Sequence, residues 1–270
     1  SKRIAEGEYE ERLSLPGGQQ MDQIDELGRL ALSFNQMADK LEKTETMRRE
    51  LIADVTHELR TPLTAVKGYL EGMTDGVLPA DPETYQQIHS EINRMQRLVN
   101  DLQELSRVEA GASDLVFTPV SPASLIERIQ NTLGRQFEEK NIQLEINVQP
   151  NLPDILVDKD RIIQVLTNLA GNALQYTPSG GKVTLLVRRE SSDVLFSVID
   201  SGIGISADQI PLIFNRFYRT DKSRTRTSGG SGIGLTIAKA LVIAHQGKIW
   251  AESQGEGKGS TFSFLIPLSK

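Results

Sequence analysis

The chain has 270 residues, 38% hydrophobic and 24% charged, which is enough to bury a core in more than one structural unit. It contains no cysteine, and this excludes disulfides, thiol nucleophiles and thiolate metal sites. The formal net charge of −6 lacks the basic excess typical of nucleic-acid-binding proteins, so we expect no nucleic-acid partner. No apolar run approaches the roughly 18–20 residues of a membrane-spanning helix and no secretory leader is visible, so we expect no transmembrane segment in this chain.

The first part of the chain predicts two long helices with a coiled-coil seam. Apolar residues recur at alternating steps of three and four over residues 27–41, at steps of four over 47–59, and again at threes and fours over 88–105. The segment GVLPADP at 76–82 contains a glycine and two prolines, which predicts a break and an antiparallel hairpin. Because two such helices cannot bury their own apolar faces, we expect two hairpins to form a four-helix bundle in a homodimer.

After residue 111 the sequence alternates short apolar segments with helical ones, which predicts a two-layer α/β domain with several antiparallel strands. The predicted strands cover residues 115–120, 142–148, 182–189, 194–200, 248–253 and 261–267, and the predicted helices cover 123–139, 159–175 and 233–245.

The segment DVTHELRTPL at residues 54–63 places His57 beside Glu58 in the first long helix. If the apolar residues of this segment face the seam, the helical period turns His57 outward. Thr61 shares its face, and Pro62 removes one backbone donor, which predicts a local kink. Thr61 also stands where the zinc motif HExxH has its second histidine, which argues against zinc. A neutral imidazole can attack phosphorus while Glu58 orients or receives its other proton. A plain surface histidine is the alternative.

Two segments of the second half indicate a nucleotide site. Asn168 and Asn172 lie four residues apart on one helix face, where their amides could hold Mg²⁺ and phosphate oxygens. Asp200 ends a predicted strand in DSGIGI and could accept from an exocyclic amine such as that of adenine. Gly202 and Gly204 of this segment let the backbone approach a flat ring.

A second glycine-rich segment, GGSGIGL at residues 229–235, precedes the last predicted helix, a position suited to binding phosphate. It does not match the P-loop pattern GxxxxGK[ST], and Leu235 occupies the last position that the GxGxxG motif would require. Residues 214–228 are basic and turn-rich, which predicts a mobile lid over polyphosphate. Taken singly, each feature is also explained by a polar helix face, a turn or a solvated run of charge.

Five motifs occur in the order HELRTPL, NLAGNALQYTP, DSGIGI, IFNRFYR and GGSGIGL. They resemble the H, N, first glycine, F and second glycine boxes of two-component sensor histidine kinases, and the resemblance covers nearly the whole chain. Residues 1–46 resemble a partial HAMP signal relay with a coiled-coil linker. Residues 47–112 resemble the dimerisation and histidine-phosphotransfer hairpin. Residues 113–270 resemble the catalytic ATP-binding domain of the kinase/chaperone/topoisomerase ATPase type. Such relays usually follow a transmembrane helix, so the resemblance implies the cytoplasmic portion of a cell-membrane protein whose upstream segment is missing.

The resemblance implies roles for individual residues. His57 would be the phosphoacceptor, Glu58 its acid/base partner, and Thr61 a helper in dephosphorylating a response-regulator receiver domain. The predicted ATP and Mg²⁺ site comprises Asn168, Asn172, Tyr176, Asp200, Gly202, Gly204, Arg216, Arg219, Gly230, Gly232 and Gly234. Within it, Tyr176 and Asp200 would contact adenine, and Asn168 and Asn172 would serve the metal and phosphates, with Asn172 the more direct ligand. Gln175 stands where many relatives carry Lys or Arg, so that one phosphate contact is not carried over.

The expected function is autophosphorylation of His57 by ATP, followed by transfer to an aspartate of a response regulator. Two alternatives remain open. One is a nucleotide-binding pseudokinase whose helical hairpin serves only as a docking module. The other is an ATPase of the chaperone or topoisomerase type, which leaves the HELRTP hairpin unexplained.

Overall fold

The structure, a computed structural model, describes residues 26–109, 115–219 and 231–268. The chain divides into two compact units, residues 1–79 and residues 80–270. Within the described ranges, no helix has the length and apolar character that crossing a membrane would require.

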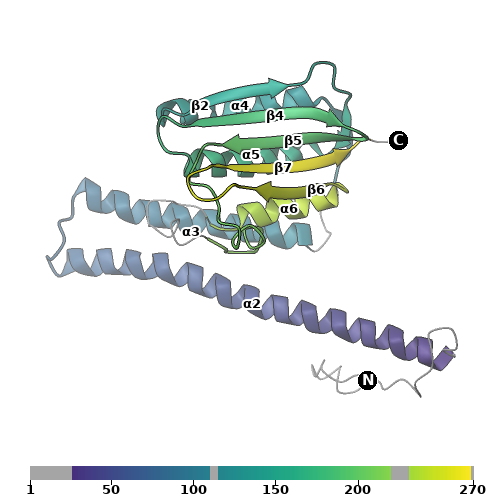
Figure 1. Cartoon of the computed structure of the whole chain (residues 1–270). Helices are drawn as coiled ribbons and strands as arrows, with labels where there is room; N and C mark the ends of the chain where they lie inside the picture. The colour runs from purple at the N-terminus through teal and green to yellow at the C-terminus, as the bar shows by residue number, and fades with distance from the viewer. Residues whose placement is uncertain (1–25, 110–114, 220–230, 269–270) are drawn as a thin grey trace. The chain divides into compact units, whose positions relative to one another are not determined.

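The described part of the first unit is one long helix and the turn that follows it (Figure 1). Helix α2 spans Glu26–Thr74 and continues through Pro62, whose ring removes only one backbone donor. The kink expected there stays a prediction. The helix ends in a turn where Gly76 has a φ of 71° and the amide of Val77 donates to the carbonyl of Gly72. The chain therefore leaves the helix where the GVLPADP segment predicts a break.

The second unit begins with helix α3, Pro82–Glu109, which is capped by Asp81. The Asp81 carboxylate accepts from the backbone amide of Thr84 at 2.8 Å, and this hydrogen bond lowers the pKa of Asp81. Pro82 occupies the first helical position, where the missing amide hydrogen has no helical partner to lose. The two predicted long helices are thus confirmed, with a capped start after the break.

A five-stranded mixed sheet forms one layer of the second unit (Figure 1). Its strands, in spatial order, are β2 (Gln143–Val148), β4 (Lys182–Glu190), β5 (Asp193–Asp200), β7 (Ser260–Pro267) and β6 (Lys248–Glu252). Strands β2 and β4 are parallel, and the other neighbouring pairs are antiparallel. Along β4, Val183, Leu185 and Val187 are buried, which is the two-residue period expected of a strand with one covered face.

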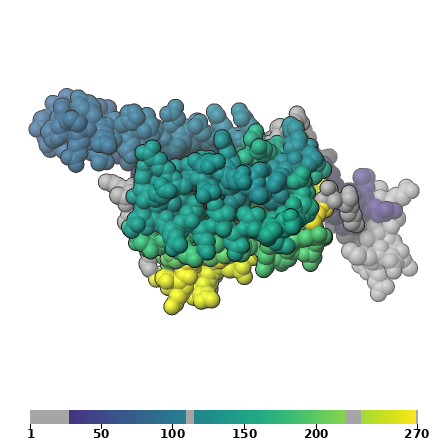
Figure 2. All heavy atoms as spheres, turned by 90° about the horizontal axis from the view of Figure 1, so that it is seen from above, coloured from purple at the N-terminus to yellow at the C-terminus, as the bar shows by residue number. Residues whose placement is uncertain are grey.

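Three helices, α4 (Pro122–Glu139), α5 (Lys159–Tyr176) and α6 (Gly234–Ala244), lie on one face of this sheet (Figure 1). Their apolar residues recur at steps of three and four, as Leu125 and Ile129 of α4 do, and both of these are buried. Figure 2 shows the second unit from the side of α4 and β2, whose side chains, drawn in teal, cover this face without a break. The helices and the sheet enclose one core, which confirms the predicted two-layer α/β fold.

The strand expected over residues 115–120 is wrong in extent. Only β1 (Thr118–Val120) pairs, and it pairs antiparallel with β3 (Ile155–Val157), a strand that the sequence pattern does not predict. Val116 and Phe117 precede this ladder and are 68% and 43% exposed. A paired segment of three residues is too short to show a two-residue period, so neither its ends nor its partner can be found by periodicity.

Helix α5 is anchored at its first turn by Asp158 and His245. The Asp158 carboxylate accepts from the backbone amides of Asp160 and Arg161 at 3.1 and 3.2 Å. The Asp158 amide in turn donates to Nε2 of His245 at 3.1 Å. The other ring nitrogen, Nδ1, donates to the carbonyl of Leu241 at 2.8 Å, so one neutral tautomer satisfies both nitrogens. Burial lowers the pKa of His245.

We expect His245 to make the stability of the second unit depend on pH. A proton added to Nε2 would face the Asp158 N–H, so protonation weakens the folded state. Because the folded pKa lies below the unfolded value of about 6.5, stability is fully present above about pH 6.5 and is lost as pH falls toward the folded pKa. One proton gives a slope of at most about 1.4 kcal/mol per pH unit.

Urea unfolding between about pH 7.5 and about pH 5 measures this dependence. His245→Phe is expected to lower stability at neutral pH and to reduce the slope. His89, an exposed histidine of α3, provides the matched control, and His89→Gln should change neither quantity. A slope that His245→Phe leaves unaltered would contradict the assignment.

Candidate active site

Three predicted site residues lie within one turn of α2. The side chain of His57 is 80% exposed, as the helical period predicts, and its Nδ1 lies 4.0 Å from Oε1 of Glu58. The two side chains are adjacent, but this distance is longer than that of a hydrogen bond. The hydroxyl of Thr61 donates to the carbonyl of His57 at 3.4 Å. An exposed imidazole with an adjacent carboxylate is accessible to a large substrate and has a proton acceptor at hand.

The second unit contains a cavity of about 840 Å³, a size suited to a small-molecule ligand. Eight predicted site residues line it, namely Asn168, Asn172, Tyr176, Asp200, Gly204, Arg219, Gly232 and Gly234. Gly202 and Arg216 are not among the lining residues. Gly230 and residues 220–228 of the predicted lid lie outside the described part of the chain. The fold thus brings together residues that are more than sixty positions apart in the sequence.

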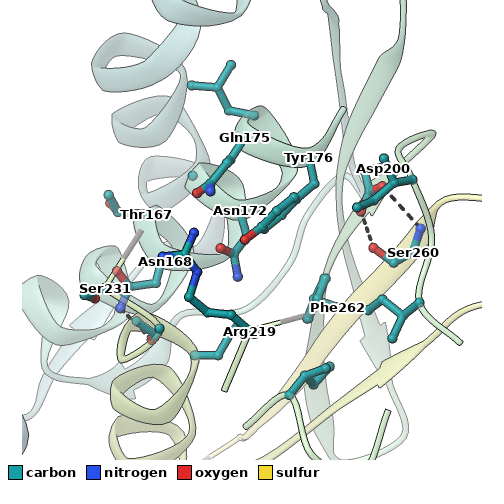
Figure 3. A pocket seen from close by; sticks show the side chains of 18 of the residues that line it. Thr167, Asn168, Asn172, Gln175, Tyr176, Asp200, Arg219, Ser231, Ser260 and Phe262 are labelled. Carbon is teal, nitrogen blue, oxygen red and sulfur yellow. Dashed lines mark hydrogen bonds between the residues drawn. The ribbon is translucent and has the colours of Figure 1, made fainter. Parts of the chain in front are cut away.

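Helix α5 forms one wall of the cavity. Its core face, which includes Ile162 and Leu166, is fully buried, so the adjoining face of the same helix is left for polar residues. Asn168, Asn172 and Tyr176 occupy this face and project into the cavity (Figure 3). The side-chain nitrogen of Asn168 donates to the carbonyl of Gly234 at 3.0 Å, so its oxygen is the atom suited to a cation.

Asp200 stands at the end of β5 and is 7% exposed. Its carboxylate accepts from the amide of Gly202 at 2.8 Å and from both the amide and the hydroxyl of Ser260 (Figure 3). A carboxylate has about four acceptor positions, so Asp200 can still accept from a ligand amine. Sequence reasoning missed Ser260, because its contact depends on the pairing of β5 with β7, which no local pattern reveals.

Gly202 is required by close packing although it does not line the cavity. A Cβ added there would lie 2.5 Å from the carbonyl oxygen of Tyr176 and 2.7 Å from Oδ1 of Asp200. The amide of Ile203 also donates to the Tyr176 carbonyl, at 3.2 Å. The segment after β5 is thereby held against the end of α5, which places Asp200 and Tyr176 at the same end of the cavity.

Lys140 is a further lining residue that sequence reasoning missed. It follows α4, and its Nζ donates to the carbonyls of Leu174 and Gln175 at 2.7 and 2.9 Å. Burial lowers the pKa of Lys140. The last turn of α5 has no basic residue of its own, so Lys140 supplies the cation that a helix C-terminus favours. The lack of a basic residue in the last turn of α5 is the feature of the sequence that could have indicated a cation from elsewhere in the chain.

The residues that line the cavity have hydrogen-bonding groups that a nucleotide could use. Nε2 of Gln175 is buried without a hydrogen-bond partner among the described residues. Asp200 and Ser260 offer acceptors at one end, and the glycine segment before α6 offers backbone donors at the other. Within residues 26–109, 115–219 and 231–268, no cluster of three His, Asp or Glu side chains is suited to a metal. A magnesium ion would therefore depend on amide oxygens and ligand phosphates, which is its common mode of binding.

Most of the sheet and of the cavity lies within one segment that matches a family of ATPase domains. Residues 157–270 match the family of histidine kinase-, DNA gyrase B-, and HSP90-like ATPases. Residues 47–111 match the His Kinase A (phospho-acceptor) domain, and residues 1–43 match the HAMP domain. The chain belongs to the sensor histidine kinase family.

Similar proteins include the signal transduction histidine-protein kinase BaeS of Escherichia coli (strain K12), which is 39% identical over 246 residues. That match covers 91% of this chain and 52% of BaeS, so the chain spans about half the length of this relative. Histidine kinase ThkA, solved in complex with the response regulator protein TrrA, has a TM-score of 0.69 and 27% identity over 84% of this chain and 64% of ThkA. Full-length ShkA in complex with AMPPNP has a TM-score of 0.61 and 31% identity over 82% of this chain and 46% of ShkA.

Proposed function

We propose that this chain is an ATP-dependent histidine kinase. The observation that carries the proposal is the cavity that unites Asn168, Asn172, Tyr176 and Asp200 in a chain that also displays an exposed His57. A ring nitrogen of His57 attacks the γ-phosphorus of ATP, the bond from that phosphorus to the bridging oxygen breaks, and ADP leaves. Glu58 orients the other ring nitrogen and receives its proton. A receiver-domain aspartate of a response regulator then accepts the phosphoryl group.

In this proposal the nucleotide lies along the cavity with adenine at Asp200. The carboxylate accepts from the adenine amino group, and the ring of Tyr176 flanks the base. The oxygens of Asn172 and Asn168 would hold Mg²⁺, which would neutralise phosphate charge when bound. Arg219 adds a cation at the cavity wall. Phosphoryl transfer depends mainly on positioning and charge neutralisation, and this set of residues supplies both.

We also propose that the chain functions as a homodimer. Several apolar side chains of α2 are exposed, among them Leu30 at 68%, Met37 at 51% and Met47 at 46%. Ile92 and Val99 of α3 are likewise 47% and 41% exposed. Exposed apolar residues at three- and four-residue steps are typical of a helical seam that lacks its partner. A second copy covering this seam would complete a four-helix bundle.

The partner and the reverse reaction follow from the same motif. A response-regulator receiver domain is proposed as the acceptor, supported by the solved complex of the similar ThkA with a response regulator. Thr61, one turn after His57, is proposed to orient the water that removes phosphate from the receiver domain. The match to a HAMP domain supports a place on the cytoplasmic side of a membrane-anchored sensor.

Incubation with γ-labelled ATP and Mg²⁺ tests the proposed function. The chain should acquire acid-labile, base-stable label, which should move to one member of a panel of receiver domains. The chain with ADP should also accelerate phosphate loss from that phosphorylated receiver. Nucleotide binding without labelling would favour the pseudokinase switch, and steady ATP hydrolysis without phosphohistidine would favour a chaperone- or topoisomerase-type ATPase.

A further inference from the structure

Asp101 of α3 reaches the glycine segment that opens α6. Its Oδ2 accepts a hydrogen bond from the hydroxyl of Ser231 at 2.5 Å, although the two residues are 130 positions apart. The Ser231 oxygen in turn accepts from the backbone amide of Ile233 at 3.3 Å. Through Ser231, a carboxylate is thus connected to the N-terminal backbone of α6.

This position is the one that suits the phosphates of a nucleotide. The N-terminus of a helix carries a partial positive charge and amides that lack helical partners, and the N-cap residue of α6, Ile233, makes no side-chain cap hydrogen bond. Asp101, Ser231 and Gly232 all line the cavity that also contains Asn168 and Arg219. A carboxylate and a phosphate use the same donors, and both are anions.

The charge of Asp101 is only partly compensated. Burial raises the pKa of Asp101, whereas the Ser231 hydroxyl and the charge of Arg97 act in the opposite direction. Arg97 lines the same cavity, one helical turn before Asp101. A partly desolvated carboxylate interacts strongly with any further anion brought close to it. A carboxylate in this place would therefore disfavour a bound polyphosphate and leave an uncharged ligand unaffected.

A second contact holds α3 in this place. Glu104, three residues after Asp101, forms an ion pair with Arg161 of α5, and both side chains are mostly buried. Arg161 also donates to the side chain of Gln164 at 3.1 Å, which fixes the guanidinium. Asp101 is thus brought to the cavity by a docked helix with two polar attachments.

We propose that Asp101 sets the specificity of the cavity for the phosphate part of its ligand, by competing with phosphate for Ser231 and the N-terminus of α6. Binding of a polyphosphate would then weaken the contact of α3 with the ATPase domain, and this contact would in turn weaken polyphosphate binding. This inference rests on the proposed function, because it assumes that a nucleoside triphosphate is the ligand.

Binding of AMPPNP with Mg²⁺ and of adenosine, measured by calorimetry on the full chain, tests the inference. Asp101→Asn keeps the shape and an acceptor for Ser231 but removes the charge. It should raise the affinity for AMPPNP at least about fivefold and leave the affinity for adenosine unchanged. Glu104→Gln should raise the affinity for AMPPNP by a smaller factor, because it loosens α3. Glu83→Gln, the same charge change in the first turn of α3, is the matched control and should have no effect.

Three outcomes would overturn the inference. They are an unchanged or weaker affinity of Asp101→Asn for AMPPNP, an equal gain for adenosine, and an equal gain from Glu83→Gln. Asp101→Ala provides a second variant, and circular dichroism melting confirms that each variant is folded. Failure of the unaltered chain to bind either ligand would instead refute the proposed function, and with it the inference.

Discussion

Substitution of His57 by Gln is expected to reduce labelling by γ-labelled ATP to background, at least about a thousandfold below the unaltered chain. The amide of Gln cannot act as a nucleophile toward phosphorus, so the phosphoryl group has no acceptor. Nucleotide affinity should stay the same, because the cavity belongs to the second unit and His57 to the first. Autoradiography at matched protein concentration and calorimetry with AMPPNP measure the two quantities.

His89 provides the control for this substitution. It is an exposed histidine of α3, and its Nδ1 lies 2.9 Å from Nδ2 of Asn93. His89→Gln should acquire as much label as the unaltered chain, because His89 has no part in the proposed reaction. Acid-labile, base-stable label that persists in His57→Gln would show that another side chain accepts the phosphoryl group.

Gly204→Ala is expected to destabilise the second unit by about 2–5 kcal/mol and to weaken nucleotide binding together with stability. Gly204 lines the cavity and has a φ of 71°, and a Cβ there would lie 2.0 Å from the carbonyl oxygen of Gly255. Backbone cannot yield as the end of a flexible side chain can. Relief of the overlap requires the segments after β5 and β6 to separate, which moves Asp200 away from its contacts.

Gly134→Ala is the matched control for the glycine substitution. Gly134 lies inside α4, and a Cβ there would meet only the side chain of Gln130, at 4.0 Å. Alanine is the better helix former, so this variant should gain about 0.5–1 kcal/mol. Urea unfolding of both variants gives the two free energies. Equal stability of Gly204→Ala and the unaltered chain would show that the loop carrying Gly255 rearranges without cost.

Local periodicity predicts the long elements of this protein because each of them buries one face. The strand from Asp193 to Asp200 and the helix from Lys159 to Tyr176 differ from their predicted bounds by one residue. The outward orientation of His57 follows from the helical period alone. In these cases the pattern of apolar residues and the packing of the element are set by the same contacts.

The contacts that complete the cavity could not be predicted in this way. Lys140 contacts the carbonyl of Leu174, 34 residues further along the chain, and Ser260 contacts a carboxylate 60 residues before it. Neither side chain belongs to a recurring local pattern, and a lone lysine or serine fits a solvated surface equally well. Such partners depend on which strands are neighbours, and strand order is a property of the whole fold.

The bond between Asp200 and Ser260 also links ligand recognition to the alignment of two strands. These residues are directly opposite each other in the pairing of β5 with β7. A slip of two residues would keep every apolar side chain on its original face but would displace Ser260 by roughly 6.5–7 Å. The hydrophobic core would tolerate that misfolded sheet, whereas the proposed recognition of adenine by Asp200 would not. Nucleotide affinity can therefore serve as a quality assay for correctly registered protein after refolding or after the redesign of either strand.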